Sequence, residues 1–204
     1  ILWRQSLPAE EEHLEIDRHS RYVAASCENK VLIYDFRTGS LVRQFDHPEK
    51  VHESVFLQRS DGANLLLTTC SDGNIRFWDI DSGQLIQKLF TNPVGVHSLA
   101  VSNDSSLLVT GGEDRQARVW KLPECVEIAA FPHQFSVTQV GLLEGNDLLV
   151  TSDDTLHLWS IRQQAELLSF PSGESSSTFA VSPDGHRIAI QNKARVQILD
   201  GRPE

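Results

Sequence analysis

The sequence predicts an all-β fold built from internal repeats, and two observations carry this prediction. A recurring phrase joins an apolar run, a polar turn and an alternating strand that closes on an aromatic residue and aspartate. Its clearest copy is 69–79, and further copies lie at 112–121 and 152–160, with weaker ones at 28–35 and 193–200. The Asp-Gly turn in the clearest copy is a strong hairpin signal. No stretch of the chain shows sustained helical periodicity.

The copies recur at a nearly constant spacing. Tyr34, Trp78, Trp120, Trp159 and Leu199 end successive copies, at steps of 44, 42, 39 and 40 residues. A period near forty with several short strands in each period is typical of β-propeller blades and not of helical solenoids.

The turn residues Gly, Pro, Asn, Asp and Ser divide each period into four short strands, so the whole chain, 1–204, is expected to form one domain of about five blades. The approximate blade boundaries are 8–45, 46–90, 91–131, 132–170 and 171–204. The expected strands are 13–16, 22–26, 31–36 and 41–45; 51–57, 65–70, 75–80 and 85–90; 96–101, 107–111, 117–122 and 126–131; 137–142, 148–152, 156–161 and 166–170; and 178–181, 187–191 and 196–199.

The two ends of the chain predict an open arc. Residues 1–3 read as the tail of a strand from a preceding blade, and the fifth blade stops after its third strand. A closed ring normally joins its two ends within one blade, which leaves no exposed sheet edge. We therefore expect the C-terminal part of a propeller of about seven blades, taken from a longer protein.

Composition disfavours several functions. The chain has 18 Lys and Arg against 28 Asp and Glu, a formal net charge of −10, which argues against non-specific nucleic-acid binding and anionic membranes and permits basic protein partners. Three isolated cysteines, Cys27, Cys70 and Cys125, form no zinc motif, and Cys27 and Cys70 are expected to be buried thiols. No apolar run approaches a membrane span. An intracellular protein, cytoplasmic or nuclear, is expected.

The aromatic-plus-aspartate ending at constant period resembles the WD-repeat β-propeller family, over nearly the whole chain. The resemblance implies a hydrogen-bonded set in the second blade. In this set Asp72 accepts from the ring of His47, His47 contacts the Thr68 hydroxyl, and Thr68 contacts the Trp78 indole. Buried Trp N–H and carboxylate groups both need partners, which such a chain supplies. We therefore predict that Asp72→Ala destabilises the blade by roughly 2–5 kcal/mol.

The other blades match this set in part. The third blade keeps Thr110, Asp114 and Trp120, with Asn92 at the histidine position; the fourth keeps His133, Asp153 and Trp159, with Thr151 as a possible hydroxyl. The first has Glu28 and Tyr34, and the fifth has Ser172 and Lys193. A nucleophilic triad of His47, Thr68 and Asp72 is the alternative, but recurrence with the blade period beside a strand Trp favours a structural role.

No phosphate-binding loop, paired-histidine metal motif or nucleophile elbow is present, so no cofactor, metal or enzymatic activity is expected. The resemblance implies a scaffold that binds proteins or peptides on the face made by the interblade loops and the Asp-containing turns, within a larger assembly. The candidate contacts on this face are Phe135 as an apolar anchor, Glu113, Arg115 and Lys50 as polar contacts at the rim, and His52 and His97 near the central channel.

Two alternatives to a plain scaffold stay open. In the first, the chain is the client-recognition arm of a ubiquitin-ligase adaptor or of a nucleotide-switch signalling protein. An F-box upstream would indicate the adaptor, and a phosphate-binding loop upstream would indicate the signalling protein. An enzyme using the propeller face is the remote alternative, because it would need a polar cluster at the channel mouth that the sequence does not show.

Overall fold

The computed structural model describes residues 3–4, 6–7, 11–59, 62–143, 145, 147–171, 178–182, 184–192 and 195–200. These residues form strands and turns and no helix, so the all-β prediction is confirmed. The chain divides into two compact units, Ile1–His97 and Ser98–Glu204. Each unit is described by itself.

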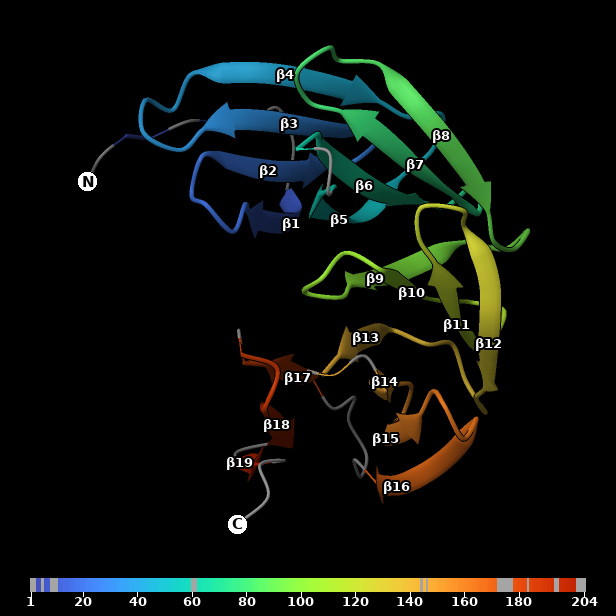
Figure 1. The fold of residues 1–204 in the computed structure, drawn as a ribbon. Helices are drawn as coiled ribbons and strands as arrows, with labels where there is room; N and C mark the ends of the chain where they lie inside the picture. The colour runs from blue at the N-terminus through green and yellow to red at the C-terminus, as the bar shows by residue number, and fades with distance from the viewer. Residues whose placement is uncertain are drawn as a thin grey trace. The chain divides into compact units, whose positions relative to one another are not determined.

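The first unit holds two four-stranded antiparallel sheets, in which neighbours in sequence are neighbours in the sheet (Figure 1). The first sheet contains β1 (Glu11–Ile16), β2 (Tyr22–Cys27), β3 (Lys30–Asp35) and β4 (Leu41–Asp46). The second sheet contains β5 (Val51–Gln58), β6 (Asn64–Cys70), β7 (Asn74–Asp79) and β8 (Leu85–Phe90). The Asp72-Gly73 hairpin turn joins β6 to β7, as the sequence predicts.

The remaining three sheets repeat the same up-and-down order. The third contains β9 (Val96–Val101), β10 (Leu107–Gly112), β11 (Gln116–Lys121) and β12 (Val126–Pro132). The fourth contains β13 (Gln139–Leu142), β14 (Leu148–Ser152), β15 (Thr155–Ser160) and β16 (Ala165–Pro171). The fifth has three strands within the described residues, β17 (Thr178–Val181), β18 (Arg187–Asn192) and β19 (Arg195–Asp200).

The expected strands agree with the observed ones apart from small differences at their ends. The clearest difference is in the fourth sheet, where β13 begins at Gln139 and not at residue 137. Thr138 instead donates its backbone N–H and its hydroxyl to the carbonyl of Ser152. The expected strand remnant at 1–3 lies partly outside the described residues, and Trp3 is not in a strand. The blade boundaries, the open arc and the seven-bladed ring stay predictions.

The pairing between the third and fourth strands shifts in register in each of the first four sheets. The shifts lie at Ile33/Tyr34, Phe77/Trp78, Val119/Trp120 and Leu158/Trp159, and in each case one residue of the fourth strand is left without a partner. An extra residue of this kind is typical of a β-bulge and adds local twist. The sequence pattern does not reveal these bulges.

Apolar side chains pack between successive sheets. In the first unit, Ile33, Phe45, Val51 and Leu66 belong to one buried cluster, and Phe45 stacks on Trp78 with 4.7 Å between the ring centroids. The second unit holds two such clusters, one in which Phe131 and Trp159 meet and one built around Phe179, Ile188 and Ile190 of the fifth sheet and Val150 and Leu156 of the fourth. Cys27 and Cys70 are buried thiols, as expected, and Cys125 is partly exposed. Nothing in the described part of the chain forms a helix that could cross a membrane.

Candidate partner-binding site

The second sheet contains a buried chain of side-chain hydrogen bonds. The indole Nε1 of Trp78 donates to the hydroxyl of Thr68 over 3.1 Å, and that hydroxyl lies 2.8 Å from Nε2 of His47. An indole N–H only donates, so the Thr68 oxygen accepts from it, and the same hydroxyl is bonded to Nε2 of His47. Burial, reinforced by the charge of Arg76, lowers the pKa of His47 to about 4.

Asp72 does not take part in this chain. Its carboxylate accepts from both Nη atoms of Arg76, with 3.1 Å to Nη1, and from the backbone N–H of Asn74. The Nδ1 atom of His47 has no hydrogen-bond partner in the described part of the chain. The expectation that Asp72 accepts from His47 is therefore wrong, because Arg76 presents two donors across the turn. Burial opposes the charge of Asp72, but the bonds from Arg76 and Asn74 outweigh it and lower the pKa of Asp72 to about 2.

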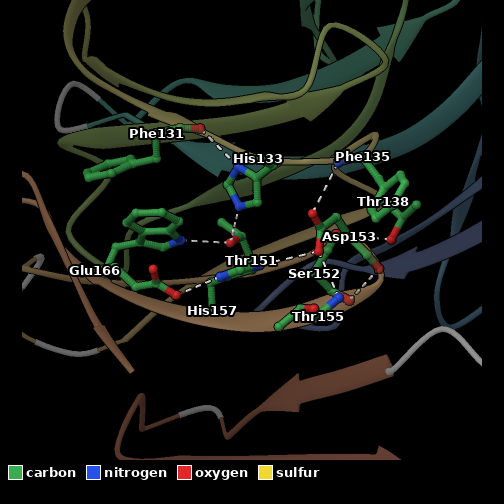
Figure 2. Close-up of polar contacts among 11 residues, drawn as sticks. Phe131, His133, Phe135, Thr138, Thr151, Ser152, Asp153, Thr155, His157 and Glu166 are labelled. Atoms are coloured by element: carbon green, nitrogen blue, oxygen red, sulfur yellow. Dashed lines mark hydrogen bonds and ion pairs between the residues drawn. The ribbon is translucent and has the colours of Figure 1, made fainter. Parts of the chain in front are cut away.

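The fourth sheet repeats the hydrogen-bond chain in full (Figure 2). Trp159 Nε1 donates to Thr151 over 2.9 Å, and the Thr151 hydroxyl lies 2.6 Å from His133 Nε2. His133 Nδ1 then donates to the carbonyl of Phe131 over 2.9 Å. Burial lowers the pKa of His133, although the bond to Phe131 acts in the opposite direction. Thr151, which the sequence offers only as a possible hydroxyl, occupies the centre of this set.

Asp153 joins the turn of the fourth sheet to the preceding loop. Its carboxylate accepts from the backbone N–H of Thr155 at 2.7 Å and from the backbone N–H of Phe135 at 3.3 Å. It also lies 3.3 Å from Nε2 of His157, whose Nδ1 lies 2.8 Å from Glu166 (Figure 2). Burial opposes the charge of Asp153, but these backbone bonds and His157 outweigh it, so the pKa of Asp153 is lowered.

The third sheet keeps only part of the set. Trp120 Nε1 donates to Thr110 over 3.0 Å, and Asp114 pairs with Arg118 at 2.6 Å. Asn92, at the histidine position, accepts from the backbone N–H groups of Val94 and Gly95 and so caps its own loop. Ser172 and Lys193, at the equivalent positions of the fifth blade, lie outside the described residues.

The turn aspartate pairs with the side chain four residues later in three consecutive sheets. The pairs are Asp72–Arg76, Asp114–Arg118 and Asp153–His157. Our interpretation of the sequence missed Arg76, Arg118 and His157, although the spacing Asp-x-x-x-Arg or His across a hairpin turn is a signal that could have found them.

Thr68 is fully buried, and its hydroxyl is bonded to both Trp78 and His47. A nucleophile must reach a substrate and have a base that accepts its proton in a mobile geometry. In the described residues, no three His, Cys, Asp or Glu side chains are placed to hold a metal ion.

An accessible surface forms in the second unit where a turn meets a loop. Val137 N–H donates to the carbonyl of Gly112, and His133 N–H donates to the carbonyl of Arg115. These two bonds lie on either side of Phe135, whose side chain is 47% exposed. Glu113 and Arg115 are exposed on the same turn, and Arg115 adopts a left-handed backbone with φ of 63°. We call Glu113, Arg115 and Phe135 the Phe135 surface.

The first unit places its candidate residues around the turn that holds Asp72. The carbonyl of the exposed Lys50 accepts from Ser71 N–H, and the Ser71 hydroxyl lies 2.9 Å from Nε2 of His52. The rings of His52 and His97 are neighbours, with 4.6 Å between their centroids.

Among the exposed apolar residues of the first unit, two that our interpretation of the sequence did not single out lie at or beside the loop that follows β8. Phe90, at the end of β8, is 60% exposed, and Val94, in the following loop, is 48% exposed. Phe135 is therefore not alone among the described residues in offering apolar surface near a loop.

The repeats of this chain match a known family. Residues 40–79 and 83–121 match the model "WD domain, G-beta repeat". Together with the five antiparallel sheets, this match shows that the chain contains repeats of the WD-repeat family.

Several curated proteins are similar to it. The chain is 30% identical over 124 residues to the U5 small nuclear ribonucleoprotein 40 kDa protein of Dictyostelium discoideum, and this aligned region covers 58% of this chain and 35% of that protein. It is 30% identical over 121 residues to WD repeat and SOCS box-containing protein 1 of Takifugu rubripes, covering 58% and 28%. It is 26% identical over 161 residues to the target of rapamycin complex subunit wat1 of Schizosaccharomyces pombe, covering 72% and 50%. The chain thus spans half or less of the length of these relatives.

Proposed function

We propose that this chain is a non-catalytic scaffold that binds partner proteins or peptides through its loops and turns, with the Phe135 surface as a principal contact. The observation that carries the proposal is the placement of an aromatic side chain, half exposed, on a loop fixed by backbone bonds at both ends. An anchor that is ordered before binding loses little conformational entropy when a partner arrives. Glu113 and Arg115 would add polar contacts around it.

A binding role without catalysis is supported by the use of the polar groups. In the second and fourth sheets, Thr68 and Thr151 are buried and bonded to His47 and His133, of which His47 is buried and His133 partly buried. The exposed groups of the Phe135 surface are an aromatic ring, a carboxylate and a guanidinium, and aromatic residues and arginine are enriched at protein interfaces.

Proteins are the proposed partners. Similar proteins are named as a ribonucleoprotein component and as a complex subunit, which supports a place in a larger assembly. The net charge of −10 disfavours direct binding of RNA or DNA. We also propose an intracellular location, cytoplasmic or nuclear, in keeping with three cysteines that form no disulfide within the described residues.

A second candidate, the recognition arm of an adaptor protein, is favoured by one relative in which WD repeats accompany a SOCS box. In such a protein the repeats select a client and the other domain acts on it. The length of that relative beyond the aligned part is compatible with this arrangement.

The experiment is a quantitative affinity capture with the double variant Phe135→Ala/Glu113→Arg. The matched control is Leu168→Ala/Glu124→Arg, which makes the same kinds of change at exposed positions of the second unit away from the Phe135 surface. Circular dichroism verifies that both variants are folded, and nuclease treatment of the extract removes partners held through RNA.

We expect a set of proteins to be lost from the Phe135 variant and kept by the control. A purified member of that set should then bind the parent chain directly, with Kd raised about tenfold or more by Phe135→Ala, which is the loss typical of an aromatic anchor. Equal recovery of every partner by the two variants would place the contact elsewhere.

A further inference from the structure

A second surface, opposite in charge to the chain as a whole, lies at two turns of the first sheet. The turn 17–21 joins β1 to β2, and the turn 36–40 joins β3 to β4. The backbone N–H of Phe36 donates to the carbonyl of Arg21 over 2.8 Å, so the two turns are held side by side. The carbonyl of Phe36 in turn accepts from the indole of Trp3 over 2.8 Å.

The carboxylates of Asp17 and Asp35 accept hydrogen bonds from groups of their own turns. Asp17 is buried and accepts from the backbone N–H groups of His19 and Arg21 and from Nε of Arg21. Asp35 accepts from the N–H groups of Arg37 and Thr38 and from the Thr38 hydroxyl. The hydrogen bonds of both carboxylates thus go to groups of their own turns, and Asp35 also interacts electrostatically with Arg37.

Two arginines and a histidine of these turns, Arg18, Arg37 and His19, are exposed. His19 Nε2 lies 2.9 Å from the amide oxygen of Gln58, which fixes the imidazole ring. The guanidinium of Arg37 and the hydroxyl of Ser20 donate no hydrogen bond to any residue that the structure describes, so both remain available to a ligand.

These groups converge on a hollow of about 440 Å³ that is lined by His19, Ser20, Phe36 and Arg37. It offers a guanidinium, an imidazole and a hydroxyl beside an aromatic ring on a fixed backbone. Guanidinium binds carboxylate and phosphate groups through paired hydrogen bonds. The ring of Phe36 would pack against the aliphatic part of the group that carries the anion.

The basic character belongs to this sheet in particular. In the second sheet the same turn position as Arg37 is occupied by Asp81, and in the third it is occupied by Pro123. The fourth sheet has Arg162 there, but the neighbouring turn of that sheet contributes Asp147 and, unlike the turn 17–21, has no arginine or histidine in its sequence.

We propose that the hollow lined by His19, Ser20, Phe36 and Arg37 binds the acidic side chain of a peptide segment from a partner protein, a carboxylate or a phosphate held by Arg37. A long polyanion is the poorer ligand, because the chain carries a net charge of −10 and only this small area is basic. The inference does not depend on the Phe135 surface, which lies in the other unit.

The test is a fluorescence anisotropy titration with short labelled peptides of one sequence. One peptide is rich in glutamate, one has phosphoserine in place of a glutamate, and one has glutamine at each acidic position. A single-stranded RNA oligonucleotide is the fourth probe. The variant is Arg37→Glu, which keeps the hydrogen bond from the backbone N–H of residue 37 to Asp35. The matched control is Arg162→Glu, which changes an exposed arginine at the equivalent turn position of the fourth sheet.

We expect the glutamate or the phosphoserine peptide to bind the parent chain and the glutamine peptide to bind at least about tenfold more weakly. Arg37→Glu should weaken acidic-peptide binding by about tenfold or more, as expected when a charge-assisted pair becomes a repulsive one, and Arg162→Glu should leave it unchanged. The tighter of the two acidic peptides shows which anion the partner supplies. Absence of acidic-peptide binding, equal loss in the two variants, or tighter binding of the RNA would overturn the proposal.

Discussion

Thr68→Val tests the buried hydrogen-bond chain most directly, because it removes the hydroxyl and nearly preserves the shape. Thr68 is fully buried and its hydroxyl serves two groups, the indole N–H of Trp78 and Nε2 of His47. Each buried polar group that loses its partner costs about 1–3 kcal/mol. The free energy of unfolding should therefore fall by about 2–6 kcal/mol.

Thr110 provides an internal control for this number. It is as buried as Thr68, but among the bonds of its hydroxyl the structure shows only the one from Trp120. Thr110→Val should consequently cost about 1–3 kcal/mol, roughly half as much. Thr151, which serves both Trp159 and His133, should behave like Thr68.

The assay combines urea unfolding at pH 7 with the indole N–H signals in NMR spectra. All four tryptophans donate an indole hydrogen bond, so each variant should shift and deprotect one signal. Thr68→Val should act on the signal of Trp78. Equal destabilisation by Thr68→Val and Thr110→Val would show that the bond to His47 adds nothing and would refute the reasoning.

Three further outcomes follow from the first unit. Asp72→Ala leaves the guanidinium of Arg76 buried without its carboxylate and should cost about 3–5 kcal/mol by urea unfolding; a loss below 1 kcal/mol would mean that water replaces the carboxylate. Gly73→Ala should be strongly destabilising by the same assay, because φ is +74° and a Cβ would lie 1.7 Å from a backbone oxygen of the next loop; a midpoint equal to that of the parent would contradict this. The pKa of His47 is lowered to about 4 in the folded state. The neutral ring therefore contributes its full share of the free energy of unfolding above pH 6.5, and this share of about 3 kcal/mol is lost as the pH falls towards 4. Burial raises the pKa of Glu15 to about 7, so protonation of Glu15 stabilises the folded state as the pH falls. The free energy of unfolding should therefore fall more steeply with decreasing pH in Glu15→Gln than in the parent; identical slopes would contradict the assignment.

The strands and hairpins could be predicted from the sequence because their signals are local. Alternation with period two and turns such as Asp72-Gly73 fix where a strand ends, independently of distant residues. The Trp–Thr pairs of the second and third sheets could also be found, because in both the partners lie ten residues apart around a hairpin. In the fourth sheet the turn is shorter and the spacing is eight residues, so the sequence offers Thr151 only as a possible hydroxyl.

The partner of Asp72 could not be predicted in the same way. His47 and Arg76 both carry donors, and the choice between them depends on the direction of each side chain in the finished hairpin. Arg76 lies four residues after Asp72 in the chain, and its guanidinium reaches the Asp72 carboxylate with two N–H groups. The β-bulges and the exposure of Phe90 and Val94 depend in a similar way on backbone twist and on neighbouring loops, which no single segment specifies.

The aspartate of the fourth sheet connects stability to the proposed function. The carboxylate of Asp153 holds the backbone N–H of Phe135 on one side and His157 on the other, so the loop that carries the exposed ring is bonded to the turn of a packed sheet. A ring on such a loop presents the same shape to every partner. The polar bonds that satisfy the interior of the sheet thus also order the surface that we propose as its binding site, and a variant that disturbs Asp153 should weaken both.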